Sequence, residues 1–310
     1  MKLTELINLL VDEQNNPNSK RAPIKINLVT HAGRFHSDEV TATAILELFL
    51  DQFGIDYEVI RDSFPAKCGF TDDSPYTIVY DIGLGRYDHH QTGDAASHCT
   101  RIDADGTIGK YASVGLIWKE IGPYMFPNMW EEIYDLFIRS IDDHDNGKQS
   151  SQFSRMIAVF NPAPDGRPSS EDRKFFEVEA SVKMLFKRIF ENYKELADQY
   201  QVIQLGLSLS DGEDYVEKEN YLYTLKDYPA ARKYCRDNHI PFYIYPSSRT
   251  GYCFETIQVT PGNMEDHIKD IPAEVRNWEG VNFLHASCFL GAADTKERAI
   301  EIVETICREF

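Results

Sequence analysis

Histidines and aspartates recur in four separate segments of the first half of the chain: THAGRFHSDE, TIVYDIG, YDHHQ and IDDHDNG. These segments hold five of the nine histidines, each within a few residues of an aspartate. Imidazole and carboxylate without a nearby thiolate is the donor set of a catalytic site for manganese, zinc or magnesium. Segments so far apart in the sequence can share one site only if the fold brings all four to the same edge of a sheet.

The spacing of apolar residues predicts such a fold. IKINLVT, at 24–30, is a predicted buried strand that ends before His31, and 37–54 has the apolar spacing of a helix. Two more strands are expected at 57–62 and 76–82, which places Asp81 at the C-terminal tip of the third strand. Alternating strands and helices predict an α/β fold with a doubly wound, mainly parallel sheet. Such a sheet binds its ligands on the loops at its carboxyl edge.

The rest of the first domain is predicted to be mostly helical. The expected helices lie at 111–121, 129–141 and 170–205. The helix at 129–141 delivers the IDDHDNG segment as a loop, so that Asp142 and Asp145 reach the same edge as the strand tips. Four loops from distant parts of the chain can then converge on one metal site.

A stretch rich in glycine, serine and acids, GLSLSDGEDYVEKEN, is the predicted linker between two domains. After it, the pattern predicts a mixture of helices and strands at 229–238, 241–246, 252–259, 281–286 and 295–308. We therefore predict a metal-binding catalytic domain over 1–205, a linker over 206–220 and a smaller C-terminal α+β domain over 221–310.

Composition narrows the classes of function. The net charge of −18 over 310 residues repels nucleic acid and anionic membranes at long range, so metal ions or a small basic pocket must attract a phosphate-bearing substrate locally. No apolar run approaches the roughly 20 residues that span a bilayer, and the N-terminus lacks the layout of a signal peptide. The six cysteines are scattered without a CxxC pair, which indicates free thiols in a reducing compartment. We expect a cytoplasmic protein with no membrane partner.

The motifs also resemble a known family. A DHH triplet preceded by an aspartate-tipped strand and a His/Asp loop resembles the DHH phosphoesterase superfamily, which includes RecJ-type exonucleases, small-oligonucleotide ribonucleases and family-II pyrophosphatases. THAGRFHSDEVTATA, VYDIGLGRYDHHQ, YASVGLIWKEIG, IDDHDNG and FNPAPD resemble, in order, motifs of the melanocyte proliferating gene 1 family of predicted metal-dependent exonucleases. The stretch from YPSSRTGYCFE to FLHASCFLGAADTKERAIEIV resembles that family's second domain, with Cys288 where the family has a glycine.

The resemblance implies a site for two divalent cations, two Mn²⁺ in the first place, with Mg²⁺ or Zn²⁺ as alternatives. Phosphoester hydrolysis with two metals uses a bridging carboxylate, and Asp81 on its rigid strand tip is the natural bridge. The other implied ligands are His31 and His36 for one cation, Asp38 and His89 for the other, and either Asp142 or Asp145 to complete the shell.

The remaining candidates concern proton transfer and substrate binding. We expect Asp88 to accept a hydrogen bond that fixes the tautomer of a histidine, which leaves His90 free to protonate the leaving oxygen. Arg34 and Arg86 flank the ligand segments and are expected to screen the charge of the phosphate. The resemblance further implies a second domain that closes over the metals, with Arg249, His285 and Ser287 as its substrate-binding residues.

The predicted function is metal-dependent hydrolysis of phosphodiester bonds at RNA or DNA ends or in short oligonucleotides. Hydrolysis of a small phosphoanhydride or nucleotide is the nearest alternative, because long polyanions are repelled by the acidic chain. A non-catalytic metal-binding scaffold is the third hypothesis. A homodimer is compatible with the sequence, which leaves the oligomeric state open.

Overall fold

The computed structural model describes residues 2–15, 24–103, 106–162, 168–209, 213–249 and 251–310. The chain forms two compact units, Met1–Glu191 and Asn192–Phe310, and the boundary between them falls inside the long helix α7 (Pro168–Leu209). The predicted linker begins within the end of α7 and also contains β6 (Tyr215–Glu217), a strand of the second unit, while 210–212 lie outside the described residues. The domain boundaries of 1–205 and 221–310 stay predictions.

A parallel sheet organises the first unit. Its order is β2-β1-β3, and the strands are β1 (Lys25–Thr30), β2 (Asp56–Arg61) and β3 (Thr77–Val79). The apolar run of β1 occupies the central position, where Ile26, Leu28 and Val29 are fully buried. The predicted mixed α/β architecture with a parallel sheet is confirmed. The doubly wound arrangement and the α+β class of the C-terminal unit stay predictions.

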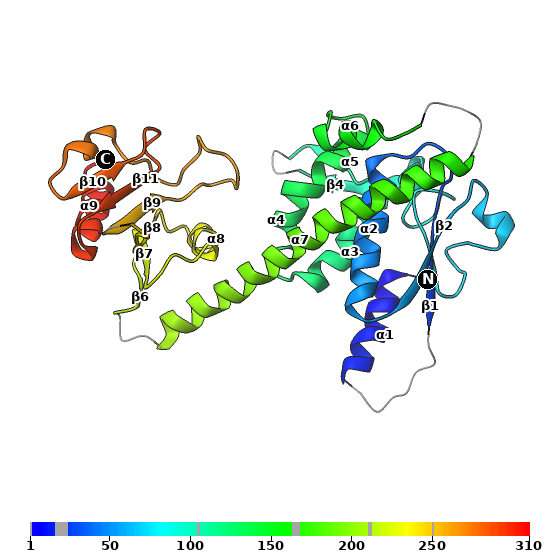
Figure 1. Cartoon of the computed structure of the whole chain (residues 1–310), viewed down its shortest axis with the longest axis horizontal. Helices are drawn as coiled ribbons and strands as arrows, with labels where there is room; N and C mark the ends of the chain where they lie inside the picture. The colour runs from blue at the N-terminus through cyan, green and yellow to red at the C-terminus, as the bar shows by residue number, and fades with distance from the viewer. Residues whose placement is uncertain (1, 16–23, 104–105, 163–167, 210–212, 250) are drawn as a thin grey trace. The chain divides into compact units, whose positions relative to one another are not determined.

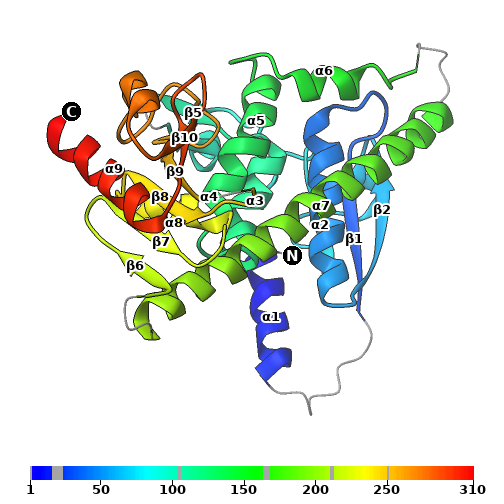
Figure 2. The ribbon, with the colours of Figure 1, turned by 60° about the vertical axis from the view of Figure 1, so that its left-hand side comes forward.

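Helix α2 packs against β1, β2 and α3 (Figures 1 and 2). Helix α2 (sequence SDEVTATAILELFLDQ) is buried over most of its length, and the buried stretch includes the acidic residues Asp38, Glu39 and Glu47. The helices of the first unit that precede α7 are α1 (Leu3–Asn15), α2 (Ser37–Gln52), α3 (Ser113–Met125), α4 (Trp130–Ile133), α5 (Arg139–Asp145) and α6 (Gln152–Ala158). A small hairpin of β4 (Thr100–Ile102) and β5 (Ile108–Lys110) follows the DHH triplet.

The prediction for 129–141 was wrong in one respect. Instead of one helix and a loop, the structure has α4, a π-helical turn at Tyr134–Ile138, and α5. Asp142 and Asp145 therefore lie in the last turn of a helix and not on a loop. The Asn146-Gly147 pair, which suggests a turn, ends this helix: Gly147 has φ +69°, the left-handed conformation typical of a helix C-terminus.

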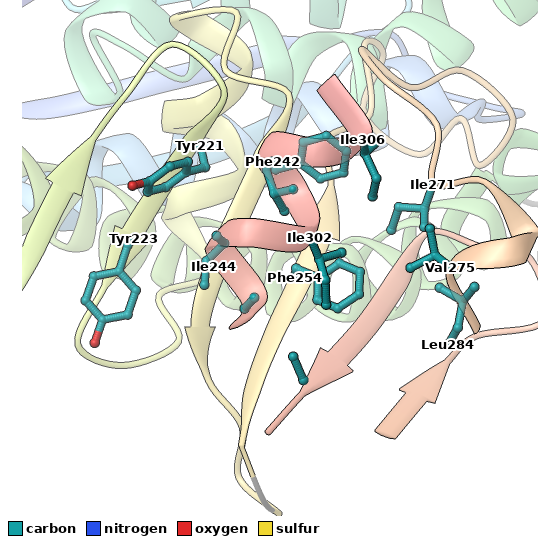
Figure 3. Packing of buried hydrophobic residues seen from close by; sticks show 13 residues of the cluster. Tyr221, Tyr223, Phe242, Ile244, Phe254, Ile271, Val275, Leu284, Ile302 and Ile306 are labelled. Atoms are coloured by element: carbon teal, nitrogen blue, oxygen red, sulfur yellow. The ribbon is translucent and has the colours of Figure 1, made fainter. Parts of the chain in front are cut away.

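The second unit is built on a six-stranded sheet in the order β10-β11-β9-β8-β7-β6. On one face, Ile302 and Ile306 of α9 (Lys296–Glu309) belong to a buried cluster with Phe242, Ile244 and Phe254 (Figure 3). On the other, α8 (Ala230–Asp237) and the end of α7 supply the core. The other strands are β7 (Tyr221–Thr224), β8 (Phe242–Pro246), β9 (Tyr252–Thr256), β10 (Val281–Leu284) and β11 (Leu290–Ala293).

Two further observations concern the helices and the cysteines. Throughout the described ranges, no helix combines the length and hydrophobicity needed to cross a membrane. The six cysteines are free thiols, as the scattered spacing predicts. The cytoplasmic location itself stays a prediction.

Candidate metal centre

The loop between β1 and α2 carries the first two predicted ligands, and it is held at several points. The buried guanidinium of Arg61 donates from Nε to the carbonyl oxygen of His31 (3.2 Å) and from Nη2 to that of Gly33 (2.8 Å). The side chain of Asn161 bonds both backbone groups of Phe35, with distances of 2.9 Å to its nitrogen and 2.7 Å to its oxygen. The position of the loop is therefore set by β2 and by the residues after α6.

Asp38 stands in the first turn of α2 and faces the start of α3. Its Oδ2 accepts from the backbone nitrogen of Ser113 (2.9 Å) and its Oδ1 from that of Val114 (2.6 Å). Burial raises the pKa of this fully buried carboxyl well above its usual range, and the charges of Asp81 and Asp145 add to the effect. The start of α3 fixes the orientation of Asp38, and the hydrogen bond from the backbone nitrogen of Val114 only partly offsets the effect of burial on its pKa.

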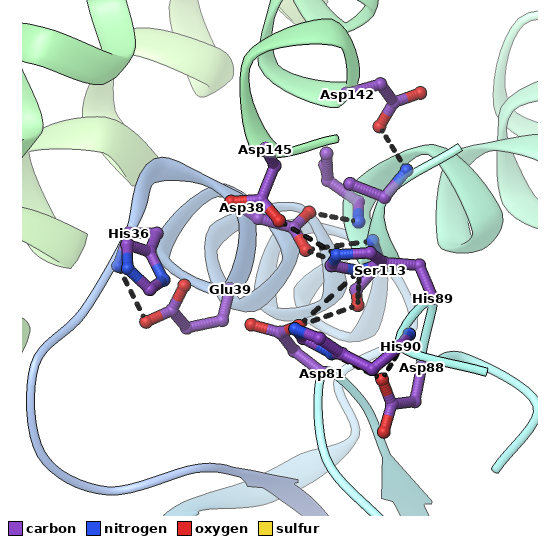
Figure 4. A network of polar contacts seen from close by, with 12 residues as sticks. His36, Asp38, Glu39, Asp81, Asp88, His89, His90, Ser113, Asp142 and Asp145 are labelled. Carbon is purple, nitrogen blue, oxygen red and sulfur yellow. Dashed lines mark hydrogen bonds and ion pairs between the residues drawn. The ribbon is translucent and has the colours of Figure 1, made fainter. Parts of the chain in front are cut away.

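Asp81 follows β3 with φ +53°, a left-handed conformation that turns its side chain into the cluster. Its Oδ2 lies 3.3 Å from Nε2 of His31, and its Oδ1 lies 3.6 Å from Nδ1 of His89. Ser113, which the sequence did not single out, donates from Oγ to the same Oδ1 (3.2 Å). One carboxylate thus faces histidines from two different segments, as Figure 4 shows for its His89 side.

The two histidines of the DHH triplet contact different aspartates. His89 points inward, with Nε2 2.9 Å from Oδ2 of Asp145. His90 is more than half exposed, and its Nδ1 lies 2.8 Å from Oδ1 of Asp88. Burial alone would raise the pKa of Asp88, but hydrogen bonds from His90 and from the backbone nitrogen of Leu84 lower it below its usual value. Asp88 is therefore an anion that orients His90.

The two alternatives on α5 have different surroundings. Fully buried Asp142 accepts from the backbone nitrogens of Ala112 (3.0 Å) and Gly115 (3.2 Å) and from the hydroxyl of Tyr134 (2.7 Å). Burial raises its pKa to about 7. In Figure 4 it stands apart from the group formed by Asp38, His89 and Asp145. Among the described residues, the groups that could hold a metal include Asp145 and not Asp142.

Glu39 also lies in the cluster, although the sequence analysis did not select it. Its side chain is fully buried, and its Oε1 lies 3.1 Å from Nε2 of His31. His36, whose backbone nitrogen donates to the same oxygen (2.8 Å), is grouped with His31 and Glu39 as possible ligands of one ion. A glutamate three residues after a helix cap is an ordinary capping residue, so its sequence position alone carries no signal for metal binding.

The charges of the cluster suit divalent cations. Burial alone would lower the pKa of His31, but hydrogen bonds to Asp81 and Glu39 outweigh it and raise that pKa to about 11. The two carboxylates therefore favour a positive charge at the His31 ring. The imidazole and carboxylate donors match manganese, zinc and magnesium. A pocket of about 510 Å³ opens over the cluster, lined by His31, His36, Ser37, Asp81, His90, His144, Asp145, Ser154 and Ala158.

The predicted substrate-binding residues lie outside that lining. Arg34 is exposed on the loop before α2, and Arg86 pairs with Glu120 (2.8 Å) beside a separate pocket. Arg249 lines a pocket of about 670 Å³ in the second unit. His285 and Ser287 lie in the turn after β10, where the backbone nitrogen of Ser287 donates to Nδ1 of His285 (3.1 Å). The roles of these residues stay predictions.

The turn after β10 contains Cys288 in a left-handed backbone conformation. This residue has φ +55°, the left-handed conformation that glycine adopts at no steric cost. Cys288 adopts this conformation although the conformation favours glycine.

Comparison with known proteins places the chain in a family. The family model MYG1_exonuc, described as an uncharacterised protein family (UPF0160), matches residues 27–306. The "MYG1 exonuclease" of Homo sapiens is 22% identical over 352 residues, covering 94% of this chain and 90% of that protein. The "MYG1 protein" of Schizosaccharomyces pombe is 23% identical over 325 residues, covering 89% of this chain and 96% of that protein. The "MYG1 protein" of Chlamydia pneumoniae is 31% identical over 153 residues, and that match spans only 46% of this chain and 47% of the relative.

A solved structure, RecJ in complex with Mn²⁺ from Thermus thermophilus, aligns with 99% of this chain and 55% of that chain at 13% identity. Its TM-score of 0.29 is too low to establish a common fold. The family assignment rests on the match over 27–306, which includes the four His/Asp segments and most of the second unit. The chain belongs to the MYG1_exonuc family.

Proposed function

We propose that this chain is a metal-dependent phosphoesterase that hydrolyses phosphodiester bonds at RNA or DNA ends or in short oligonucleotides. The names of relatives from Homo sapiens and Mus musculus, "MYG1 exonuclease", support a nuclease, and the His/Asp cluster supports a requirement for metal. The pocket over the cluster is open to solvent and lined by polar side chains, which suits a charged substrate.

The position of Asp81 carries this proposal. Its two oxygens face different groups of donors, with Oδ2 toward His31 and Oδ1 toward His89. We propose that His31 and His36 hold one cation, that Asp38, His89 and Asp145 hold the other, and that Asp81 is shared between them. Two cations at such a site would bind the phosphate and lower the pKa of an attacking water. Manganese is the first candidate, with magnesium and zinc as alternatives.

We assign the proton transfer to His90. Its Nδ1 is occupied by Asp88, so Nε2 is the nitrogen available to the pocket. The carboxylate of Asp88 favours the protonated ring, because it stabilises the positive charge, and hydrogen bonds from His90 keep Asp88 ionised. A protonated, solvent-accessible imidazole can donate to the oxygen of the leaving alcohol.

We assign the second unit to substrate binding, through Arg249, His285 and Ser287. The pocket beside Arg249 combines a cation with exposed Phe283, a pairing that suits the phosphate and base of a nucleotide. Arg34 and Arg86 would contribute positive charge from the first unit. Without these positively charged residues, the chain would repel an oligonucleotide, because the net charge of the chain is −18.

The decisive experiment combines metal analysis with a substrate panel. The purified protein is loaded in turn with Mn²⁺, Mg²⁺ and Zn²⁺ and assayed on pyrophosphate, mononucleotides, dinucleotides and longer oligonucleotides. We expect two bound cations per chain and the highest kcat/KM on dinucleotides or oligonucleotide ends. Preference for pyrophosphate would favour the small phosphoanhydride alternative. Two bound cations without hydrolysis of any substrate would favour the scaffold, and a protein that binds no divalent cation would refute the proposal.

A further inference from the structure

Glu39 has a feature that helix capping does not explain. Its side chain is fully buried in the first turn of α2. One oxygen, Oε1, accepts from the backbone nitrogen of His36, while the other, Oε2, has no hydrogen-bond partner in the described structure. A buried polar atom left unpaired destabilises the fold, and more so when it is charged. The cap therefore occupies one oxygen and leaves the other buried without a partner.

The neighbouring imidazole is oriented toward Glu39. His31 has its Nδ1 3.1 Å from the carbonyl oxygen of Ala32, which can only accept, so Nδ1 carries a hydrogen. The opposite nitrogen, Nε2, lies 3.1 Å from Oε1 of Glu39 and 3.3 Å from Oδ2 of Asp81. Histidine ligands of metals commonly donate their other ring nitrogen to a backbone carbonyl. Nε2 and the two carboxylates therefore converge on one point.

The negative charge of the cluster also favours a cation beside Glu39. Four carboxylates surround it, namely Asp38, Glu39, Asp81 and Asp145, whereas Asp88 is already paired with His90. Two divalent cations would neutralise these four charges, and buried charges need compensation. We infer that Glu39 is a direct ligand of the cation that His31 and His36 hold. This inference rests on the proposed two-cation function and adds a ligand that the motif resemblance did not supply.

The ligand sets would then differ between the two cations. The cation at Glu39 has two imidazoles, while the cation at Asp38 and Asp145 has the single imidazole of His89. Imidazole suits transition metals, and Mg²⁺ prefers carboxylate and water oxygens. The Glu39 position is therefore the one that retains Mn²⁺ when Mg²⁺ is in excess.

The test is Glu39→Gln in the full chain. Glutamine at this helix position keeps the capping contact but removes the charge. We measure Mn²⁺ binding by calorimetric titration and thermal unfolding with either EDTA or Mn²⁺. The variant should lose at least about tenfold in affinity at one of two Mn²⁺ positions. Its Tm should fall further below that of the wild type in Mn²⁺ than in EDTA, because a lost ligand matters only when the cation is bound.

Two further variants serve as controls for this test. Glu47→Gln changes a buried glutamate of the same helix that pairs with Lys183 (2.7 Å), and it should leave Mn²⁺ binding unchanged. Glu39→Ala removes the cap as well, so it should lower Tm in EDTA yet lose the same Mn²⁺ affinity. If wild type binds two Mn²⁺ ions and Glu39→Gln binds both equally well, Glu39 is only a capping residue. If the wild type binds no Mn²⁺, the proposed function itself fails.

Discussion

Asn161 and Phe35 are joined by a pair of hydrogen bonds that spans 126 residues of sequence. Phe35 is fully buried and lies between the two histidines of the first segment. The amide of Asn161 therefore acts as a clamp on the loop that presents His31 and His36. Because this clamp comes from the FNPAPD segment, that motif has a structural reason to accompany the metal-binding motifs, although its residues 163–165 lie outside the described structure.

Removing the clamp should loosen the first segment. Asn161→Ala leaves both backbone groups of Phe35 without their side-chain partner, so we expect a loss of about 1–3 kcal/mol in the free energy of unfolding. Metal affinity should fall as well, because His31 and His36 lose their fixed spacing. Denaturant titration and Mn²⁺ binding measure the two effects. Asn128→Ala, at an exposed position, is the control, and equal behaviour of the two variants would show that Asn161 is not a clamp.

Asp81→Asn tests the shared carboxylate. Asparagine tolerates the left-handed backbone of this position, so the fold should be kept. Loss of the bridging charge should abolish binding of one cation and nearly all hydrolysis. In EDTA, Tm should change little or rise, since clustered carboxylates repel each other. Unchanged turnover in Asp81→Asn would contradict the two-metal proposal.

Sequence patterns predicted much of this fold for clear physical reasons. The strand at 24–30 and the helix at 37–54 are long apolar stretches between polar segments, and their ends place His31 and Asp38 close to the observed element boundaries. The sequence did not point to Glu39, because a glutamate at that helix position is already explained by helix capping. Ser113 lies within the YASVGLIWKEIG segment, but one serine in a helical pattern gives no sign of a contact with Asp81. Contacts such as that of Asn161 join distant segments, and periodicity carries no information about them.

The choice between Asp142 and Asp145 shows another limit. Both lie in one helical turn, three residues apart, and only tertiary contacts separate them. Asp145→Asn should weaken one Mn²⁺ position and hydrolysis while leaving Tm in EDTA nearly unchanged. Asp142→Asn should instead lower the free energy of unfolding by about 1–3 kcal/mol, because Asp142 satisfies two backbone nitrogens at the start of α3. If Asp142→Asn loses metal and Asp145→Asn does not, Asp142 is the ligand.

His90→Ala tests the assignment of the proton donor. The variant should keep both cations, because His90 faces Asp88 and the pocket, and should lower kcat by roughly 100-fold, the scale of a lost general acid. Substrates with a better leaving group should be affected less, since they need less protonation. Metal content measured beside kcat checks the division of the triplet. A parallel fall in metal content would identify His90 as a ligand.

A buried glutamate away from the metal centre makes stability depend on pH. Glu179 of α7 is buried, its Oε1 has no hydrogen-bond partner, and burial together with the charge of Glu47 raises its pKa to about 7. Between the ordinary value of 4.5 and this raised value, the folded chain holds a proton that the unfolded chain has released. The free energy of unfolding contributed by this group therefore falls as the pH rises through that window, and above it the folded chain carries a poorly compensated charge.

Glu179→Gln should remove this dependence. The neutral amide keeps the size of the side chain, so the variant and the wild type should be similarly stable near pH 5, where Glu179 is protonated in the folded chain. Near pH 8 the variant should be more stable by about 1–3 kcal/mol, since each pKa unit corresponds to about 1.4 kcal/mol. Denaturant titrations in EDTA across this range measure the difference, with the exposed Glu195→Gln as the control. A gain that is the same at both pH values would arise from packing and would exclude a titrating carboxyl at this position.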